Sequence, residues 1–368
     1  MVRNPINRPS MAPLAGILAL SLVVAVPAQD SVKLKDGTVE TGRVESENYD
    51  ALVFKAKKGK EDKQLRLSWG DVEEVQYGAA NDYYKATNAL STGDIAGGMQ
   101  RLQALATNAS LRKELKPAVA LNLGLAQLRS GKPADGAATL AEMIKASPNS
   151  RYLLQAARGL AECYIATGDA AAGSAAIDAA AAQATEGGVD ANAAAAFDYF
   201  RGLMLEAKKD YANAKIKFGL VASARSAPAG YPALGKLGAA RCAAAAGQVD
   251  QAKKDFDSLI NEGTTNEVLA GAWNGKAELM LADGIKGKNM ERLLDASLMF
   301  LRGVVEFAPA AGQNSTEYER AMAGAAEAFK QMAEVESDAN LKKQHAARSR
   351  ARLEQLKKEY PHSAFLPK

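Results

Sequence analysis

The chain has 368 residues, of which 48% are hydrophobic, 24% charged and only 6% aromatic, and its formal net charge is +4. So large an apolar fraction excludes an intrinsically disordered chain, and so small a net charge excludes the strongly basic balance of a nucleic-acid-binding domain. Abundant alanine with few aromatic residues favours closely packed helices over a β-sandwich.

Residues 1–28 have the three parts of a secretory signal peptide. Arg3 and Arg8 supply a positive start, residues 14–26 form an uncharged apolar run of thirteen residues, and Ala28 ends a short segment suited to cleavage. Such a run spans about 20 Å as a helix, less than the roughly 30 Å of a bilayer core. We therefore predict export to the periplasm or the cell exterior, with no membrane span in the mature chain. Retention of the segment as an anchor stays open, and a lipid anchor is not expected because no cysteine lies near the cut.

Residues 29–78 form a separate small β module. The Asp36-Gly37 dipeptide is a strong hairpin turn between two segments of alternating apolar and polar residues. Five short strands are predicted in this module, with a charged loop at 57–63 between the third and the fourth. They lie at residues 31–35, 38–45, 51–55, 64–67 and 72–77.

The segments LKDGTVETGRVESEN and LRLSWGDVEEV of this module resemble small SH3-like and Sm-like barrels. The resemblance implies a half-open barrel whose end is filled by Trp69 and Tyr77. Sm-like barrels often bind RNA, but this segment has no aromatic platform on which bases could stack. We therefore expect no nucleic-acid partner.

From residue 80 to residue 362 the helical period continues, broken by short turns. Five of these turns lie 38, 37, 41 and 38 residues apart, which is the signature of a repeat. Four of them contain a glycine, which can adopt the left-handed conformation that ends a helix. The turns are Gly93-Asp94, Gly131-Lys132, Gly168-Asp169, Lys209-Asp210 and Gly247-Gln248.

Three positions around each turn repeat the same residue size. The residue seven before the turn is small in all five units: Ala86, Gly124, Ala161, Gly202 and Ala240. The residue five after it is also small: Gly98, Gly136, Gly173, Ala214 and Ala252. The residue nine after it is large and apolar: Leu102, Leu140, Ile177, Phe218 and Phe256. Small residues let two antiparallel helices approach closely, and we expect the large one to fill the wedge between one pair and the next.

This pattern resembles the tetratricopeptide repeat, with the Leu123-Gly124 pair, the turn glycine Gly131, the apolar Leu140 and the closing Pro148 of one unit. The resemblance implies a mostly α protein, a right-handed superhelical solenoid of about seven units over residues 80–362. The units depart from the family in length, 37–41 residues rather than 34. The later units are less regular, with a linker predicted at 284–289 and final helices at 318–334 and 339–360.

No catalytic motif occurs in the sequence. The only histidines are His345 and His362, and Cys163 and Cys242 have no metal-ligand spacing. We therefore predict that the protein is not an enzyme and has no cofactor or metal, and that the two cysteines are buried and unpaired. The basic last helix is expected to cap the array, with attraction to an acidic partner or an anionic lipid surface left open.

In solenoids of this family the first helix of each pair lines a concave face. Counting back from each turn to the positions of the first helix that face inwards predicts the partner contacts. They are Tyr83, Arg129, Gln155, Arg158, Glu162, Tyr199, Glu206 and Arg241. The predicted function is an exported scaffold that binds protein or peptide partners. Two alternatives stay open: a self-associating assembly component, and an envelope hydrolase or carbohydrate-binding protein.

Overall fold

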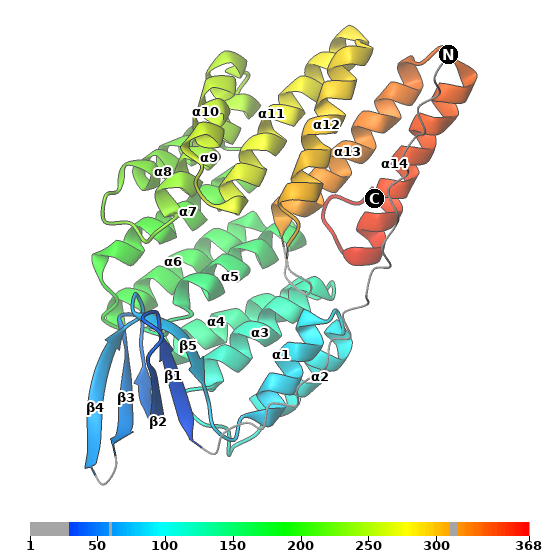
Figure 1. Cartoon of the computed structure of the whole chain (residues 1–368). Coiled ribbons are helices and arrows are strands. Elements are labelled where there is room, and N and C mark those ends of the chain that lie inside the picture. Colours follow the sequence, from blue (N-terminus) through cyan, green and yellow to red (C-terminus); the bar gives the residue numbers. More distant parts are fainter. Residues whose placement is uncertain (1–28, 59–60, 310–314, 368) are drawn as a thin grey trace, which may run out of the picture.

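The computed structural model describes residues 29–58, 61–309 and 315–367, so the predicted signal segment lies outside the described residues. The described chain is mostly α-helical, with five strands followed by fourteen helices (Figure 1). None of the helices in this described part combines the length and the apolar character that a bilayer span requires.

The strands form one antiparallel sheet in the order β4-β3-β2-β1-β5. All five predicted strands are present. The predicted loop at 57–63 is wrong, because Lys57 pairs with Asp62 and the β3–β4 pairing continues to Lys58 and Glu61. The strands are β1 (Asp30–Leu34), β2 (Val39–Glu47), β3 (Ala51–Lys58), β4 (Glu61–Ser68) and β5 (Val72–Gln76).

The sheet does not close into the predicted barrel, because β4 and β5 remain its two edges among the described strands. The helical array covers the apolar face of the sheet instead. Phe54 and Val32 pack in one cluster with Leu115, Tyr83 and Tyr84 from the helical region. The helices therefore supply the layer that a closing pair of strands would have supplied.

Polar side chains join the sheet to the helices. Asp30 is only 2% exposed, and its carboxylate accepts hydrogen bonds from the Val44 and Gly78 backbone N–H groups, each at 2.7 Å. The Arg112 guanidinium binds the same carboxylate with two nitrogens, at 2.6 and 2.8 Å. A bidentate, buried pair of this kind sets a fixed orientation between the module and the array.

Trp69 and Tyr77 lie at this junction rather than at a barrel end. The Trp69 indole N–H donates to the Asn48 carbonyl at 2.8 Å, and the Arg151 guanidinium stacks on the indole at 4.5 Å. Tyr77 is buried in the sheet core and donates its hydroxyl to Glu47. Both aromatic side chains therefore connect the module to the repeats.

The helices pack as consecutive pairs, and each odd-numbered helix also contacts the next odd-numbered helix. In Figure 1 the pairs follow one another in chain order along a curved stack. Stacked in this way, the helices form a repeat array of seven helical hairpins among the described residues. The helices are α1 (Asn81–Ser91), α2 (Ile95–Ala106), α3 (Lys116–Arg129), α4 (Pro133–Ala146), α5 (Leu153–Thr167), α6 (Ala170–Glu186), α7 (Ala191–Ala207), α8 (Tyr211–Ser223), α9 (Tyr231–Ala245), α10 (Val249–Glu262), α11 (Asn266–Gly287), α12 (Met290–Glu306), α13 (Thr316–Val335) and α14 (Ala339–Glu359).

The five predicted turns all lie between paired helices. Their glycines have positive φ values between 72° and 88°, as a left-handed helix end requires. Lys209 takes the same conformation without being a glycine, with φ 62°. In three turns the following aspartate caps the next helix by accepting a backbone N–H.

The predicted wedges are confirmed, and all five are fully buried. Leu140 lies between two helices of neighbouring pairs, since a Cβ added to Gly124 or Gly159 would lie within 2.6 and 3.0 Å of it. Phe218 occupies the same place between Gly202 and Gly238, at 2.6 Å from either added Cβ. A large side chain fits here because its neighbours have none.

One boundary in the irregular part differs from the prediction. α11 continues through the predicted linker to Gly287, and Lys288 ends it in the left-handed conformation. Gly284 is buried against Leu293 of α12, where an added Cβ would lie 2.9 Å from the leucine side chain. The glycine therefore marks a close helix–helix approach rather than a chain break.

Candidate functional site in the concave groove

The odd-numbered helices line a concave groove, which we define by the residues around two adjoining pockets of about 370 and 760 Å³. Its apolar floor includes Leu128 of α3, Ile165 of α5 and Leu203 of α7. Leu90 and Leu125 extend the floor towards α1. Successive first helices thus present leucine and isoleucine side chains along one continuous surface.

Most of the predicted partner-contact residues line this groove. They are Arg129, Gln155, Arg158, Glu162, Tyr199, Glu206 and Arg241. Tyr83 does not, because its ring extends from α1 into the core between the sheet and α3, and its hydroxyl accepts from Asn122 Nδ2 at 3.4 Å. A partner contact at any of the eight stays a prediction, but the structure shows which side chains already have partners within the chain.

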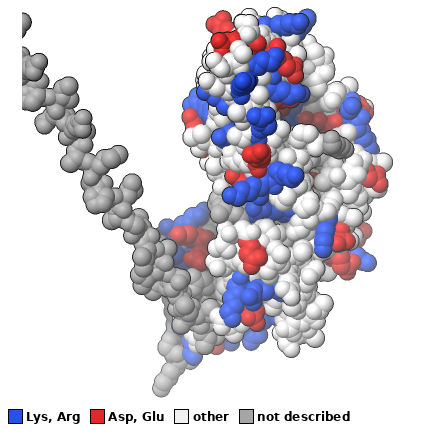
Figure 2. Space-filling model, turned by 90° about the vertical axis from the view of Figure 1, so that its right-hand side faces the viewer, with Lys and Arg blue, Asp and Glu red and all other residues white. Residues whose placement is uncertain are grey.

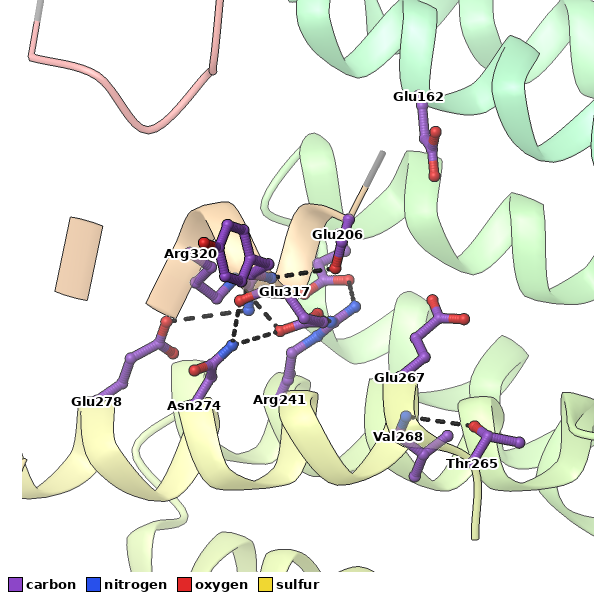
Figure 3. Close-up of polar contacts among 12 residues, drawn as sticks. Glu162, Glu206, Arg241, Thr265, Glu267, Val268, Asn274, Glu278, Glu317 and Arg320 are labelled. Carbon is purple, nitrogen blue, oxygen red and sulfur yellow. Dashed lines mark hydrogen bonds and ion pairs between the residues drawn. The ribbon is translucent and has the colours of Figure 1, made fainter. Parts of the chain in front are cut away.

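A buried ion network occupies the floor between α9, α11 and α13 (Figure 3). Arg241 Nη1 lies 3.0 Å from Glu317 Oε1, and Arg241 Nη2 lies 3.2 Å from Glu206 Oε2. Asn274 Nδ2 donates to Glu317 Oε2 at 3.0 Å, and Arg320 Nε lies 3.9 Å from the same carboxylate. The side chains of Arg241 and Glu317 are 11% and 7% exposed, so these charges are held mainly by one another.

Both central groups of this network stay ionised. Burial, the largest influence on Glu317, disfavours its charge, but the Arg320 and Arg241 cations and the Asn274 hydrogen bond outweigh it and lower the pKa of Glu317. Burial likewise opposes the charge of Arg241, yet the Glu206 and Glu317 carboxylates raise its pKa above the ordinary value. Arg241 and Glu317 are therefore matched charges, whereas burial raises the pKa of the neighbouring Glu278, which lies 3.9 Å from Arg320.

A second ion pair spans the groove. Arg158 Nε lies 3.0 Å from Glu162 on the same helix, and Arg158 Nη1 lies 2.9 Å from Glu267 Oε2 of α11. Arg158 and Glu267 are 109 residues apart in the sequence. The curvature of the helical stack is what brings α5 and α11 close enough for this ion pair. Arg158 and Arg241 therefore each form ion pairs with carboxylates of the same chain.

Arg129 differs from the other groove arginines. Among the described residues no carboxylate lies within an ion-pair distance of its guanidinium, and its Nη1 is buried without a hydrogen-bond partner. Its nearest aromatic contact is the Tyr360 ring, 5.6 Å from the guanidinium carbon. Arg129 lines both pockets, and its charge partly offsets the burial that raises the pKa of Glu319.

Sequence reasoning missed the groove residues that come from α11, α13 and the C-terminal end of the chain. Glu267, Glu317 and Arg320, and the buried Asn274 that contacts Glu317, lie in units without a regular turn, so no offset could place them. The fully buried Asn274 is flanked by small and apolar helix residues, and this isolated polar side chain was the one available signal.

The residues after α14 form a C-terminal segment, residues 360–366, that also lines the smaller pocket. The His362 ring packs against Gly131 in the α3–α4 turn, where an added Cβ would overlap it. Phe365 lies under the Arg320 guanidinium at 5.6 Å, and Ser363 faces the Glu319 side chain, where it partly offsets the burial that raises the pKa of Glu319. The last residues of the chain therefore touch the second helical pair.

Positive charge gathers on the outer side of α14, which faces the viewer in the upper part of Figure 2. Six exposed lysines and arginines lie on this helix, and none is in an ion pair within the described chain: Lys342, Lys343, Arg348, Arg350, Lys357 and Lys358. Within the described chain no further helical pair covers this face, and an uncovered repeat needs a polar outer face.

Cys163 and Cys242 are buried and unpaired, as predicted. In the part of the chain that the structure describes, no three His, Cys, Asp or Glu side chains are grouped as metal ligands. The groove thus offers apolar surface, arginine and carboxylate groups to a ligand.

No family model and no curated protein matches this sequence. Among solved structures, a tetratricopeptide repeat protein from Parabacteroides merdae is similar, with 16% identity, a TM-score of 0.42, and coverage of 73% of this chain and 99% of that one. A likeness of this size defines neither the fold nor the function of the chain.

Proposed function

We propose that this protein is an exported, non-catalytic tetratricopeptide-like scaffold whose concave groove binds an extended segment of a protein partner. The supporting observation is the groove itself, in which Leu128, Ile165 and Leu203 from three successive first helices form an apolar floor beside arginines and carboxylates. An apolar floor supplies affinity and a charged rim supplies orientation, the combination that suits peptide recognition.

Ile165 is the best position at which to test this function, because its side chain is 39% exposed at the groove floor. Peptides selected from a random library on the full chain would be measured by calorimetry. We expect Ile165→Asp to weaken binding at least about tenfold, since burying a carboxylate against an apolar ligand costs more than about 1.4 kcal/mol.

Ile216 provides a matched control, because it is 62% exposed on α8 and does not line the groove. Ile216→Asp introduces the same charge elsewhere and should leave peptide affinity unchanged. Selection that enriches no peptide, or equal losses in the two variants, would contradict the proposed groove function.

Export rests on the pattern in residues 1–28 and needs its own test. Those residues would be fused to alkaline phosphatase lacking its signal, an enzyme that requires an oxidising compartment for activity. Activity in cells is the expected result, and replacing Leu20 and Val23 of the apolar run with aspartate should abolish it. An inactive fusion of the unaltered segment would count against export.

A second candidate function, self-association, is favoured by an exposed apolar row on α12. Leu294, Leu298 and Val305 lie on one side of this helix, and Val305 is 77% exposed. Such a row is unusual on the outside of a soluble repeat array. Light scattering on the full chain should show a defined oligomer that Leu298→Asp dissociates; a monomer at all concentrations removes this alternative.

A further inference from the structure

The C-terminal segment, residues 360–366, occupies part of the groove to which we assign partner binding. It extends from the end of α14 across to the α3–α4 turn, and five of its residues line the smaller pocket beside Leu128, Ile165 and Leu203. An incoming peptide and this segment would therefore compete for the same space.

Side chains rather than a continuous backbone ladder hold the segment. Among the described residues its backbone hydrogen bonds are local: Tyr360 N donates to the Leu356 carbonyl of α14 at 2.7 Å, Ser363 N to the Tyr360 carbonyl at 3.0 Å, Phe365 N to the Ser363 hydroxyl at 3.2 Å, and Leu366 N to the Ser363 carbonyl at 3.2 Å. His362 and Ala364 are exposed, while Phe365 is half-buried. A segment held in this way can detach without breaking any helix or strand.

The contacts of the segment also define a recognition chemistry. The Arg320 guanidinium covers the Phe365 ring, the Glu319 carboxylate faces the Ser363 hydroxyl, and the α3–α4 turn accommodates the His362 ring because Gly131 has no side chain. Arginine over an aromatic ring and a carboxylate on a hydroxyl are both specific pairings.

We propose that residues 361–366 are an intramolecular occupant of the groove, which a partner displaces with an extended segment of similar chemistry. That partner segment carries an aromatic side chain for Arg320 and a hydroxyl two residues before it for Glu319. This inference rests on the proposed peptide-binding function and adds the partner's chemistry and a mode of regulation. A tethered segment acts at an effective concentration in the millimolar range, so it would mask the groove from weak ligands.

The first test opens the groove in the full chain. A fluorescein-labelled peptide with the sequence of residues 360–367 would be titrated and followed by anisotropy, using the unaltered protein and Phe365→Ala. We expect the variant to bind the peptide at least about tenfold more tightly, because the groove is vacant in a larger fraction of molecules. The same peptide with alanine in place of its phenylalanine should not bind either protein.

The second test closes the groove and keeps the inference falsifiable if Phe365→Ala fails to fold. Glu319→Cys and Ser363→Cys would be joined by a short bis-maleimide, and the matched control is the same double variant capped with N-ethylmaleimide. Cys163 and Cys242 are buried and should not react. The joined form should bind library-selected peptides at least about tenfold more weakly than the capped form.

Equal affinities in the open, closed and unaltered proteins would overturn the proposed occlusion, even if selected peptides bind. Failure of the 360–367 peptide to bind the Phe365→Ala protein would overturn the proposed partner chemistry. Failure of every selected peptide, with loss of the Ile165 effect, would instead refute the underlying groove function.

Discussion

Arg241→Met removes the cation that lies between two carboxylates on the groove floor. The substitution keeps much of the side-chain volume but deletes the 3.0 Å contact to Glu317 and the 3.2 Å contact to Glu206. Because the Glu317 side chain is only 7% exposed, its charge stays buried after its main partner is gone. Breaking one member of a buried pair costs about 3–5 kcal/mol.

We expect the lower end of that range, about 3 kcal/mol, because Asn274 and Arg320 still contact Glu317 in the variant. For a chain of this length the melting temperature should fall by roughly 6 °C, at about 2 °C per kcal/mol. Urea unfolding followed by circular dichroism at 222 nm measures the free energy of unfolding. Arg225→Met is the matched control, since Arg225 is exposed in the α8–α9 loop.

Adding Glu317→Gln to Arg241→Met separates the ion pair from simple loss of packing. With both charges removed, the double variant should be less destabilised than the sum of the two single variants by about 1–2 kcal/mol. A cost below about 1 kcal/mol for Arg241→Met, or strict additivity in the double variant, would refute the reasoning that matched buried charges hold α9 to α13.

Four further outcomes follow from the repeat packing and the buried groups. Phe218→Ala should lower the free energy of unfolding by about 3–5 kcal/mol in urea titrations, because the space that Phe218 of α8 fills between α7 and α9 becomes a cavity; a loss below about 1 kcal/mol would contradict the wedge role. Lys209→Gly should raise stability by about 0.5–1 kcal/mol, because glycine adopts the left-handed conformation without steric cost, and an unchanged melting temperature would count against strain at this turn. Burial raises the pKa of Cys163 and of Cys242 to about 12, so a thiol reagent at pH 8 should react with neither in the folded protein and with both in guanidinium; rapid labelling of the native chain would be inconsistent with this packing. The pKa of Glu317 is lower in the folded chain than its ordinary value of 4.5, so the ionised carboxylate stabilises the fold at pH values above 4.5. This contribution should disappear as the pH falls through the pKa of the folded state. Acid titration of Glu317→Gln should then show a shallower loss of stability than that of the unaltered protein, and parallel curves would dispute the assignment.

The repeat could be recognised from sequence because its causes are local. A turn residue with positive φ, a small residue at each helix crossing and a bulky wedge recur at nearly constant offsets, and each acts between helices that are neighbours in the chain. Gly124, Gly131 and Leu140 illustrate this. All three lie in one unit, and Leu140 also contacts Gly159 of the next unit. The same locality made the strands of the β module predictable from alternation and turns.

The irregular units show where locality ends. Gly284 was interpreted as part of a linker, but a glycine in a helix also permits close approach of a neighbour, and residue type alone does not distinguish the two. The barrel prediction failed for a related reason. Whether β4 and β5 close on each other depends on what covers the sheet, and here helices with Tyr83 and Leu115 cover it.

The sequence by itself determined the helical hairpins of the regular units, their order and seven of the eight side chains predicted for the groove, because these follow from residue size and spacing between adjacent elements. Only the tertiary structure decided that Arg241 meets Glu317 across 76 residues, that Arg158 meets Glu267 across 109, and that the end of the chain returns to the second pair. These contacts depend on the accumulated curvature of the stack, a small rotation at each pair that no single residue encodes. That curvature also decides which groove arginines form ion pairs and that Arg129 lines the groove with no carboxylate of the described chain within ion-pair distance.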